Sequence, residues 1–325
     1  MISSYRAPAW LPGGHLQTLY ASLLAPRPRV AYRRERWNTP DGDFIDLDWA
    51  QIRNAADANP LVVLFHGLEG NSRSQYASAL MAATRDRGWR GVVVHFRGCG
   101  GELNRLPRAY HSGDSAEIDW ILRRLKLDNP SIQLFAAGVS LGGNALLKWL
   151  GEQRDAANAI VAGAASISAP VDLTASGDAL GRGFNMIYTR NFLATMRRKT
   201  LAKLALFPEL CDRERMLNSR TLREFDNIVT APLHGYRDTD DYWTRASSKP
   251  LLRHIAAPTL MINARNDPFL PAAALPAAGE LSAKVTAEFP ATGGHVGFVT
   301  GVFPGRLDWL PQRMLNFFTE SSRLP

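Results

Sequence analysis

The sequence predicts an α/β protein with a mostly parallel central sheet, helices on both faces of that sheet, and one helical insertion. Apolar runs typical of buried strands alternate with helical segments over residues 60–171, and strands return after the insertion. Between them, residues 172–248 lose this alternation and become helical and basic. With 325 residues and 46% apolar content, the chain can form one large core and an insertion. We therefore expect a core of residues 1–171 and 249–325, with residues 172–248 forming a cap or lid.

The first strands are expected to form an antiparallel hairpin. RRERWNTP and FIDLDWA are strand-like, and Pro40-Asp41-Gly42 between them favours a turn. PLVVLFHG is a continuous apolar run with no polar alternation until His66, as in a strand covered on both faces. A helix from about Ser74 to Arg87 and a second buried strand, GVVVHF, complete a β-α-β crossover.

The same alternation continues along the chain. SAEIDWILRRLKLDNP is an amphipathic helix, SIQLFAAGVS a strand, GGNALLKWLGEQ a helix and AIVAGAASIS another strand. After the insertion, APTLMINAR and KVTAEFP are strands, and the last helix spans roughly residues 307–321. Strands that alternate with helices in this way form a mostly parallel sheet.

Composition narrows the cellular setting and the partners. Cys99 and Cys211 are too few for a disulfide framework, and the N-terminal region has neither a signal peptide pattern nor a continuous apolar span. We therefore expect a cytoplasmic protein. The net charge of +8 would suit nucleic acid or an anionic membrane, but the excess is spread along the chain and no nucleic-acid module is recognisable. We expect a basic surface and no nucleic-acid partner.

The strongest chemical signal is Gly138-Val139-Ser140-Leu141-Gly142, which fits G-x-S-x-G between an apolar strand and a helix. A serine on such a sharp turn is held in a strained backbone with its hydroxyl exposed, and small neighbours allow the turn to close. Ser140 is therefore the predicted nucleophile. The backbone N–H of Leu141, at the positive end of the helix, is the first predicted oxyanion donor.

A serine hydroxyl needs a base beside it, and in this arrangement the chain order is serine, acid, histidine. His295 follows a late strand in the glycine-rich loop Thr292-Gly293-Gly294-His295, so it is the predicted base. Asp267, in MINARNDPFLP at a strand's carboxyl end, is the favoured acid. Asp172, which follows a neighbouring strand, remains a competitor.

The loop after the first buried strand commonly supplies a second oxyanion donor, here the N–H of Leu68. His66 beside it has no histidine or carboxylate at metal-ligand spacing, so we expect a structural histidine and no metal site. The segment from Arg97 to Gly101 lacks the pattern of a phosphate-binding loop and is interpreted as a tight structural loop near the site.

Several motifs together resemble the YheT-like subfamily of α/β-hydrolases, which is related to eukaryotic α/β-hydrolase-domain acylglycerol and phospholipid lipases. They are GGHLQT, HGLEGNSRSQY, HFRGCGGELNR followed by YHSGD, GVSLGGNALLKWLGE, NARNDPFLP and GGHVGF. The resemblance covers most of the chain, is weakest in the insertion, and implies the α/β-hydrolase fold. It also implies a triad of Ser140, Asp267 and His295 that hydrolyses carboxylic esters, with short or medium acyl chains.

The expected activity is thus ester hydrolysis through an acyl-enzyme on a small-molecule substrate, without metal or organic cofactor. An acyltransferase with the same triad, or a non-catalytic ligand-binding homologue of this fold, remains an alternative. The basic side chains Arg197, Arg198 and Lys199 could face lipid phosphate or water. Apolar residues of the same segment could line an acyl pocket or pack into a core: Phe184, Met186, Ile187, Tyr188, Phe192, Leu193 and Met196.

Overall fold

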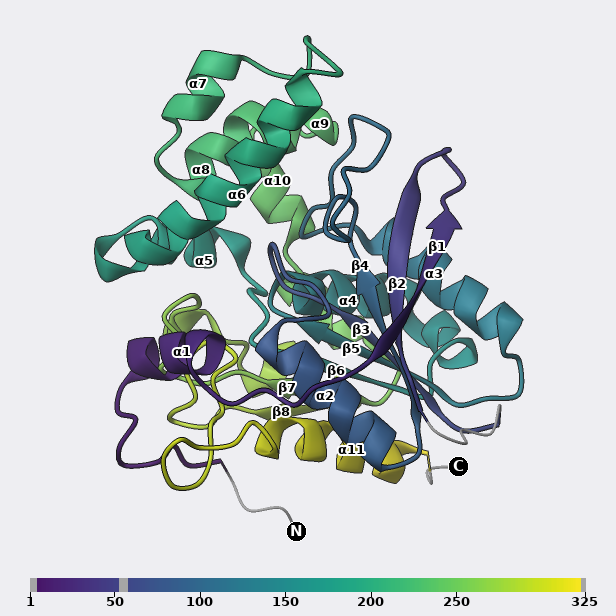
Figure 1. Ribbon diagram of the computed structural model, residues 1–325. Coiled ribbons are helices and arrows are strands. Elements are labelled where there is room, and N and C mark those ends of the chain that lie inside the picture. Colours follow the sequence, from purple (N-terminus) through teal and green to yellow (C-terminus); the bar gives the residue numbers. More distant parts are fainter. Residues whose placement is uncertain (1–4, 53–57, 323–325) are drawn as a thin grey trace.

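The computed structural model describes residues 5–52 and 58–322, and an eight-stranded sheet runs through it (Figure 1). The strand order is β1-β2-β4-β3-β5-β6-β7-β8. β1 pairs with β2 and β2 with β4 in antiparallel fashion, whereas every other pairing is parallel. The predicted hairpin and the mostly parallel sheet are therefore confirmed. The strands are β1 (Tyr32–Asn38), β2 (Phe44–Ala50), β3 (Leu61–Phe65), β4 (Arg90–His95), β5 (Leu134–Val139), β6 (Gly163–Ile167), β7 (Thr259–Ile262) and β8 (Val285–Glu288).

Helices cover both faces of the sheet, as predicted. α2 (Gln75–Asp86) and α11 (Trp309–Ser321) pack on one face, and α3 (Ser115–Asp128) and α4 (Leu141–Gln153) pack on the other. Side chains of β3 alternate between these two layers, because successive residues of a strand point to opposite faces. Val62 lies in the layer with α2 and α11, and Val63 in the layer with α3 and α4.

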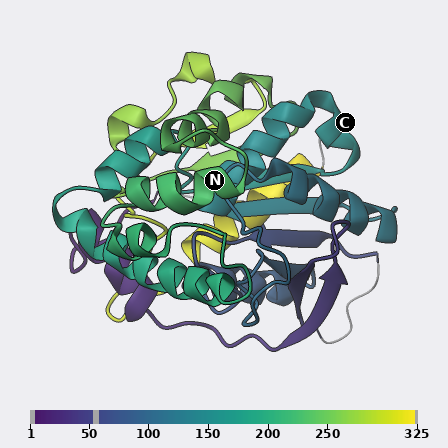
Figure 2. The ribbon, with the colours of Figure 1, turned by 90° about the horizontal axis from the view of Figure 1, so that it is seen from above.

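The described stretch between β6 and β7 contains helices and the loops that join them, but no strand. They have an apolar core of their own. Figure 2 shows them over the part of the molecule opposite the β1–β2 hairpin. The helices are α5 (Leu173–Leu180), α6 (Met186–Leu204), α7 (Arg213–Asn218), α8 (Leu222–Phe225), α9 (Ala231–Leu233) and α10 (Thr239–Ala246). The same stretch also contains the short 3-10 helices η2 (Gly183–Asn185) and η4 (Lys249–His254) and the π-helical η3 (Asp226–Thr230). Short 3-10 helices in the rest of the chain are η1 (Arg154–Ala159), η5 (Ala272–Ala274) and η6 (Ala278–Glu280).

The sequence reasoning missed one helix, α1 (Gly14–Leu23), which precedes the sheet. Its N-cap is Gly13 at φ 75°, and its first turn has no acidic residue, so the usual signals of a helix start are absent. Within the described ranges, no helix combines the length and the apolar character needed to cross a bilayer.

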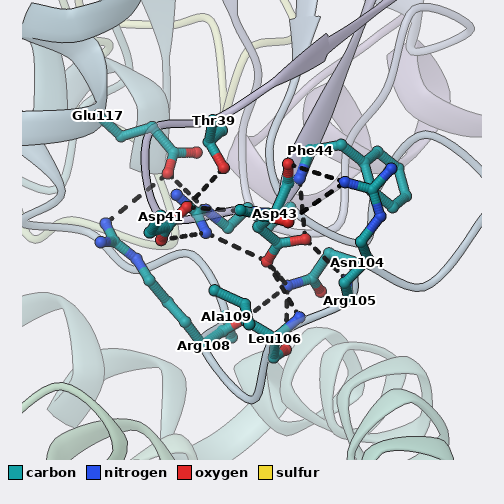
Figure 3. Close-up of polar contacts among 12 residues, drawn as sticks. Thr39, Asp41, Asp43, Phe44, Asn104, Arg105, Leu106, Arg108, Ala109 and Glu117 are labelled. Carbon is teal, nitrogen blue, oxygen red and sulfur yellow. Dashed lines mark hydrogen bonds and ion pairs between the residues drawn. The ribbon is translucent and has the colours of Figure 1, made fainter.

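The long loop between β4 and α3 is fixed by a buried polar network (Figure 3). Arg97 donates to Glu117 on α3 at 2.6 Å and to Asp43 beside the hairpin turn at 3.1 Å. Asp43, which is fully buried, also accepts from Asn104 of the loop at 2.6 Å. The network anchors the loop to the sheet and agrees with the structural role predicted for the segment that begins at Arg97.

Candidate active site

Ser140 occupies the turn between β5 and α4 in a strained conformation, with φ 53° and ψ −120°. Such a positive φ in a residue other than glycine costs about 1–3 kcal/mol and persists only where the surroundings enforce it. Here the enforcement is steric. A Cβ on Gly142 would lie 2.5 Å from the carbonyl oxygen of Phe65, and a Cβ on Gly138 would lie 2.5 Å from that of Gly142. Only glycines fit on both sides of Ser140, as the motif predicts.

The side chains of Ser140, His295 and Asp267 form one hydrogen-bonded chain. His295 Nε2 lies 3.0 Å from Ser140 Oγ, and His295 Nδ1 lies 2.9 Å from Asp267 Oδ2. The Asp267 side chain is fully buried, and its Oδ1 accepts the backbone N–H of Phe269. The ring of Phe269 stacks on the imidazole with centroids 4.0 Å apart. The structure therefore brings together the three residues that the sequence singled out.

Asp172, the competing acid, lies elsewhere. It is the N-cap of α5, where its carboxylate accepts the backbone N–H of Ala175 at 3.0 Å. This capping contact explains its position after β6 without a role at the imidazole.

Helix α1 holds the loop that carries His295. The backbone N–H of His295 donates to Thr18 Oγ1 at 2.8 Å, and that of Gly293 donates to Gln17 Oε1 at 2.8 Å. Asn266, next to the buried acid, bridges the two by donating to Gln17 and accepting from Gly294. Sequence reasoning assigned no role to Gln17 and Thr18, although both belong to the GGHLQT motif.

The loop that contains Leu68 packs against the nucleophile. A Cβ on Gly67 would lie 3.0 Å from Ser140 Cβ, and the Gly67 N–H donates to Tyr76 Oη. Leu68 and Leu141, the two residues proposed from the sequence as oxyanion donors, both line a cavity that Ser140 also lines. The loop of Leu68 and the first residue of α4, which would supply these N–H groups, therefore both lie at the nucleophile.

A polar cluster behind this loop joins it to α6. Glu69 has a positive φ of 57°, and its N–H donates to Tyr110 Oη at 2.8 Å. Its carboxylate accepts from Tyr110 Oη and from Lys199 Nζ, each at 2.8 Å. Lys199 therefore points inward rather than toward water or lipid. Its Nζ also lies 3.3 Å from Sγ of Cys99, whose thiol pKa is raised to about 11 by burial.

His66 has the structural role that the sequence predicted. It is buried, its Nδ1 lies 2.7 Å from the Gly67 carbonyl oxygen, and its Nε2 accepts the N–H of Phe96. Burial lowers the pKa of this imidazole to about 3, so it is neutral at physiological pH. Within the described part of the chain, no group of three or more potential ligand side chains could hold a metal ion.

Two spaces meet at Ser140 and His295. The first, which we call the insertion cavity, has a volume of about 100 Å³ and lies under α5, α6 and α10. None of its lining residues is exposed, and one of them is the buried carboxyl of Asp226. The second, which we call the α1 cleft, has a volume of about 390 Å³, lies between α1 and α6, and reaches the surface at Leu23 and Ile187.

Of the apolar residues expected to line a pocket or pack into a core, some line the cavity, some pack into the core and two are exposed. Phe192 and Met196 line the insertion cavity, whereas Leu193 is buried in the core of the helical segment. Phe184 and Ile187 are exposed.

A family model described as the alpha/beta hydrolase fold matches residues 60–302. The chain is 38% identical to YheT of Escherichia coli strain K12, which carries an esterase name, over 94% of this chain and 90% of that protein. It is 31% identical to mouse phospholipase ABHD3, over 97% of this chain and 78% of that protein. The esterase Pf2001 of Pyrococcus furiosus superposes with a TM-score of 0.55 at 15% identity, over 90% of this chain and 93% of that chain, which supports the fold alone.

Proposed function

The chain belongs to the YheT-like group of the α/β-hydrolase fold family, and on that premise we propose that it hydrolyses carboxylic esters through an acyl-enzyme on Ser140. The observation that carries the proposal is the hydrogen-bonded chain from Ser140 through His295 to Asp267, at 3.0 and 2.9 Å. The esterase and phospholipase names of the relatives support an ester as the substrate.

In this proposal the three side chains have separate tasks. Asp267 holds the His295 tautomer whose proton is on Nδ1, which leaves Nε2 free to take the proton of the Ser140 hydroxyl as it attacks the ester carbonyl. The N–H groups of Leu68 and Leu141 stabilise the oxyanion of the tetrahedral intermediate. His295 then protonates the departing alcohol, and a water molecule activated by the same imidazole releases the acid.

The two spaces suggest how an ester would lie. The insertion cavity is small, buried and mostly lined by apolar side chains, and we assign it to the acyl chain. The α1 cleft is larger and reaches the surface, so it suits the alcohol part. This division favours short to medium acyl chains on alcohols of variable size, which includes acylglycerols and phospholipids.

We also propose that residues 172–248 act as a cap on a core formed by residues 1–171 and 249–325. Its side chains supply much of the insertion cavity, and Lys199 reaches from the cap to the loop of Leu68. A cap in this place would set acyl specificity.

Hydrolysis of p-nitrophenyl esters of rising acyl length tests the proposal. We expect Ser140→Ala to lose about 10⁶-fold in kcat and to escape labelling by a fluorophosphonate. Ser131→Ala is the matched control, because this serine is exposed between α3 and β5 and lines neither of the two spaces. A wild-type protein that neither hydrolyses any of the esters nor reacts with the fluorophosphonate would refute the proposal. Transfer of the acyl group to an added alcohol in preference to water would favour the acyltransferase.

A further inference from the structure

Exposed apolar side chains gather around one part of the surface. Nine large apolar residues are exposed among the described residues, and seven of them belong to three short segments. These are α1 with the residue that follows it, the turn that leads into α6 together with the first residues of α6, and the loop before α11. Leu24 is 69% exposed, Phe184 is 52% exposed and Phe303 is 71% exposed. Monomeric proteins seldom expose large apolar residues in such groups unless the surface binds something.

Side-chain contacts join the three segments. The ring of His15 on α1 lies 4.6 Å from that of Phe184 in the turn before α6. Tyr20 on α1 donates a hydrogen bond to the Pro304 carbonyl oxygen at 2.8 Å, and the ring of Trp10, which precedes α1, lies 5.6 Å from that of Phe303. Figure 1 shows α1 beside the N-terminal end of α6. We call this surface the α1 face.

The α1 face borders the mouth of the α1 cleft. Leu23 and Ile187 are exposed members of the face and also line the cleft, at the other end of which lie Ser140 and His295. A molecule that enters the cleft from the surface therefore passes the exposed apolar side chains.

The three segments and their flanking residues carry basic but no acidic side chains. Residues 5–34, 179–208 and 289–307 contain no aspartate or glutamate. They do contain arginines, among them the exposed Arg182 and Arg190 near the start of α6. An apolar surface with aromatic side chains at its border and arginines but no acids in its segments is complementary to the interface of a bilayer with anionic lipid. A protein partner seated on the same face would cover the mouth of the cleft, whereas a bilayer would present molecules to it.

We propose that the α1 face docks this protein on the surface of membranes that contain anionic lipid, with the mouth of the α1 cleft turned toward the bilayer. The apolar side chains enter the headgroup region, and the arginines contact lipid phosphates. The docking itself does not depend on the proposed ester hydrolysis, because it is a property of the surface and is measured without turnover.

Co-sedimentation of the full chain with vesicles tests the proposal. We expect binding to vesicles of one part phosphatidylglycerol to two parts phosphatidylcholine, weaker binding to phosphatidylcholine alone, and loss of binding as salt is raised. The double variant Leu24→Ser with Phe303→Ser should bind the anionic vesicles about tenfold more weakly. The matched control is Leu127→Ser with Leu206→Ser, because among the described residues these are the two exposed leucines that lie outside the α1 face. This control should bind as the wild type does.

Three results would overturn the proposal: no binding of the wild type to anionic vesicles, equal loss in both double variants, or unchanged binding after replacement of Leu24 and Phe303. A dimer in solution that Leu24→Ser with Phe303→Ser dissociates would also overturn it, because the face would then be an interface between two copies. Thermal unfolding at the wild-type temperature confirms that each variant is folded. Failure of the vesicle test would leave the soluble-ester test of Ser140 unaffected, so the two proposals can fail separately.

Discussion

Replacement of Glu117 by glutamine should remove a pH dependence of stability that originates in the buried network of Figure 3. The Glu117 side chain is 2% exposed and accepts from Arg97 Nε at 2.6 Å. Arg97 also forms ion pairs with Asp41 and Asp43. Arg108 pairs with Asp114 at 2.5 Å and lies 3.7 Å from Glu117. One oxygen of Glu117 and one of Asp114 are buried without a hydrogen-bond partner among the described residues. Carboxylates thus outnumber guanidinium groups in this cluster. Burial, followed by the charge of Asp114, raises the pKa of Glu117 to about 7.

The size and sign of the effect follow from this pKa. A tenfold change in proton affinity is worth about 1.4 kcal/mol, so a rise from 4.5 to about 7 corresponds to about 3 kcal/mol of unfolding free energy. Because the folded protein binds the proton more tightly, this contribution is fully present below pH 4.5 and is lost as the pH rises through 7. Between pH 5 and pH 8 the loss amounts to about 2–3 kcal/mol.

Urea unfolding of the wild type and Glu117→Gln at several pH values measures the effect. Buried groups outside this cluster, such as His66 and His111, are present in both proteins, so their contributions cancel in the difference between the two unfolding free energies. The difference therefore reports the charge of Glu117 within its cluster. This difference should change by about 2–3 kcal/mol from pH 5 to pH 8, in favour of the variant at high pH. Glu214→Gln, at an exposed position of α7, should follow the wild type. If the difference in unfolding free energy between the wild type and Glu117→Gln stays constant from pH 5 to pH 8, the reasoning is refuted.

Three further predictions concern the site. Lys199→Met removes the ion pair to Glu69, the residue after Leu68 in the loop that would supply the second oxyanion N–H. This N–H would then be held less firmly, so kcat for p-nitrophenyl acetate should fall about tenfold with little change in KM. Gly177→Ala places a methyl group against the buried ring of Trp243, and thermal unfolding should show a loss of about 2 kcal/mol or more. Burial raises the pKa of Asp226 to about 6, so this wall of the insertion cavity becomes charged as the pH rises from 5 to 7. The ratio of kcat/KM for butyrate to that for acetate esters should fall over that range, and Asp226→Asn should make the ratio independent of pH.

Each of these variants has a control of the same type away from the site. Lys249→Met removes a lysine that lies 3.6 Å from Glu280, and it should leave kcat unchanged. Gly279→Ala introduces a methyl group into open space and should not lower stability. Asp240→Asn replaces an exposed carboxylate on α10, so the pH dependence of the ester ratio should persist. Equal effects in a variant and its control would contradict the corresponding prediction.

The strands, the main helices and the residues at the turn of Ser140 were predictable because their signals are local. An uninterrupted apolar run such as Val62 to Phe65 indicates a strand covered on both faces, and the structure buries each of these side chains. The glycines on either side of Ser140 follow from the space that the turn leaves. Chain order and a position after a late strand then favoured His295 as the base and Asp267 as the acid, although Asp172 remained an alternative acid.

Contacts between distant segments were beyond the reach of local patterns. The N–H of His295 bonds Thr18, which is 277 residues away in the sequence, and Glu69 bonds Lys199 across 130 residues. Periodicity and turn chemistry describe a few neighbouring residues, whereas these pairs form only after the helices have packed on the sheet. The same reason explains the direction of Lys199. The sequence offered only lipid phosphate or water as its surroundings, whereas the packing of α6 directs its ammonium group toward Glu69. It also explains the α1 face, since three segments that are separately unremarkable in sequence become one apolar surface only when the fold places them side by side.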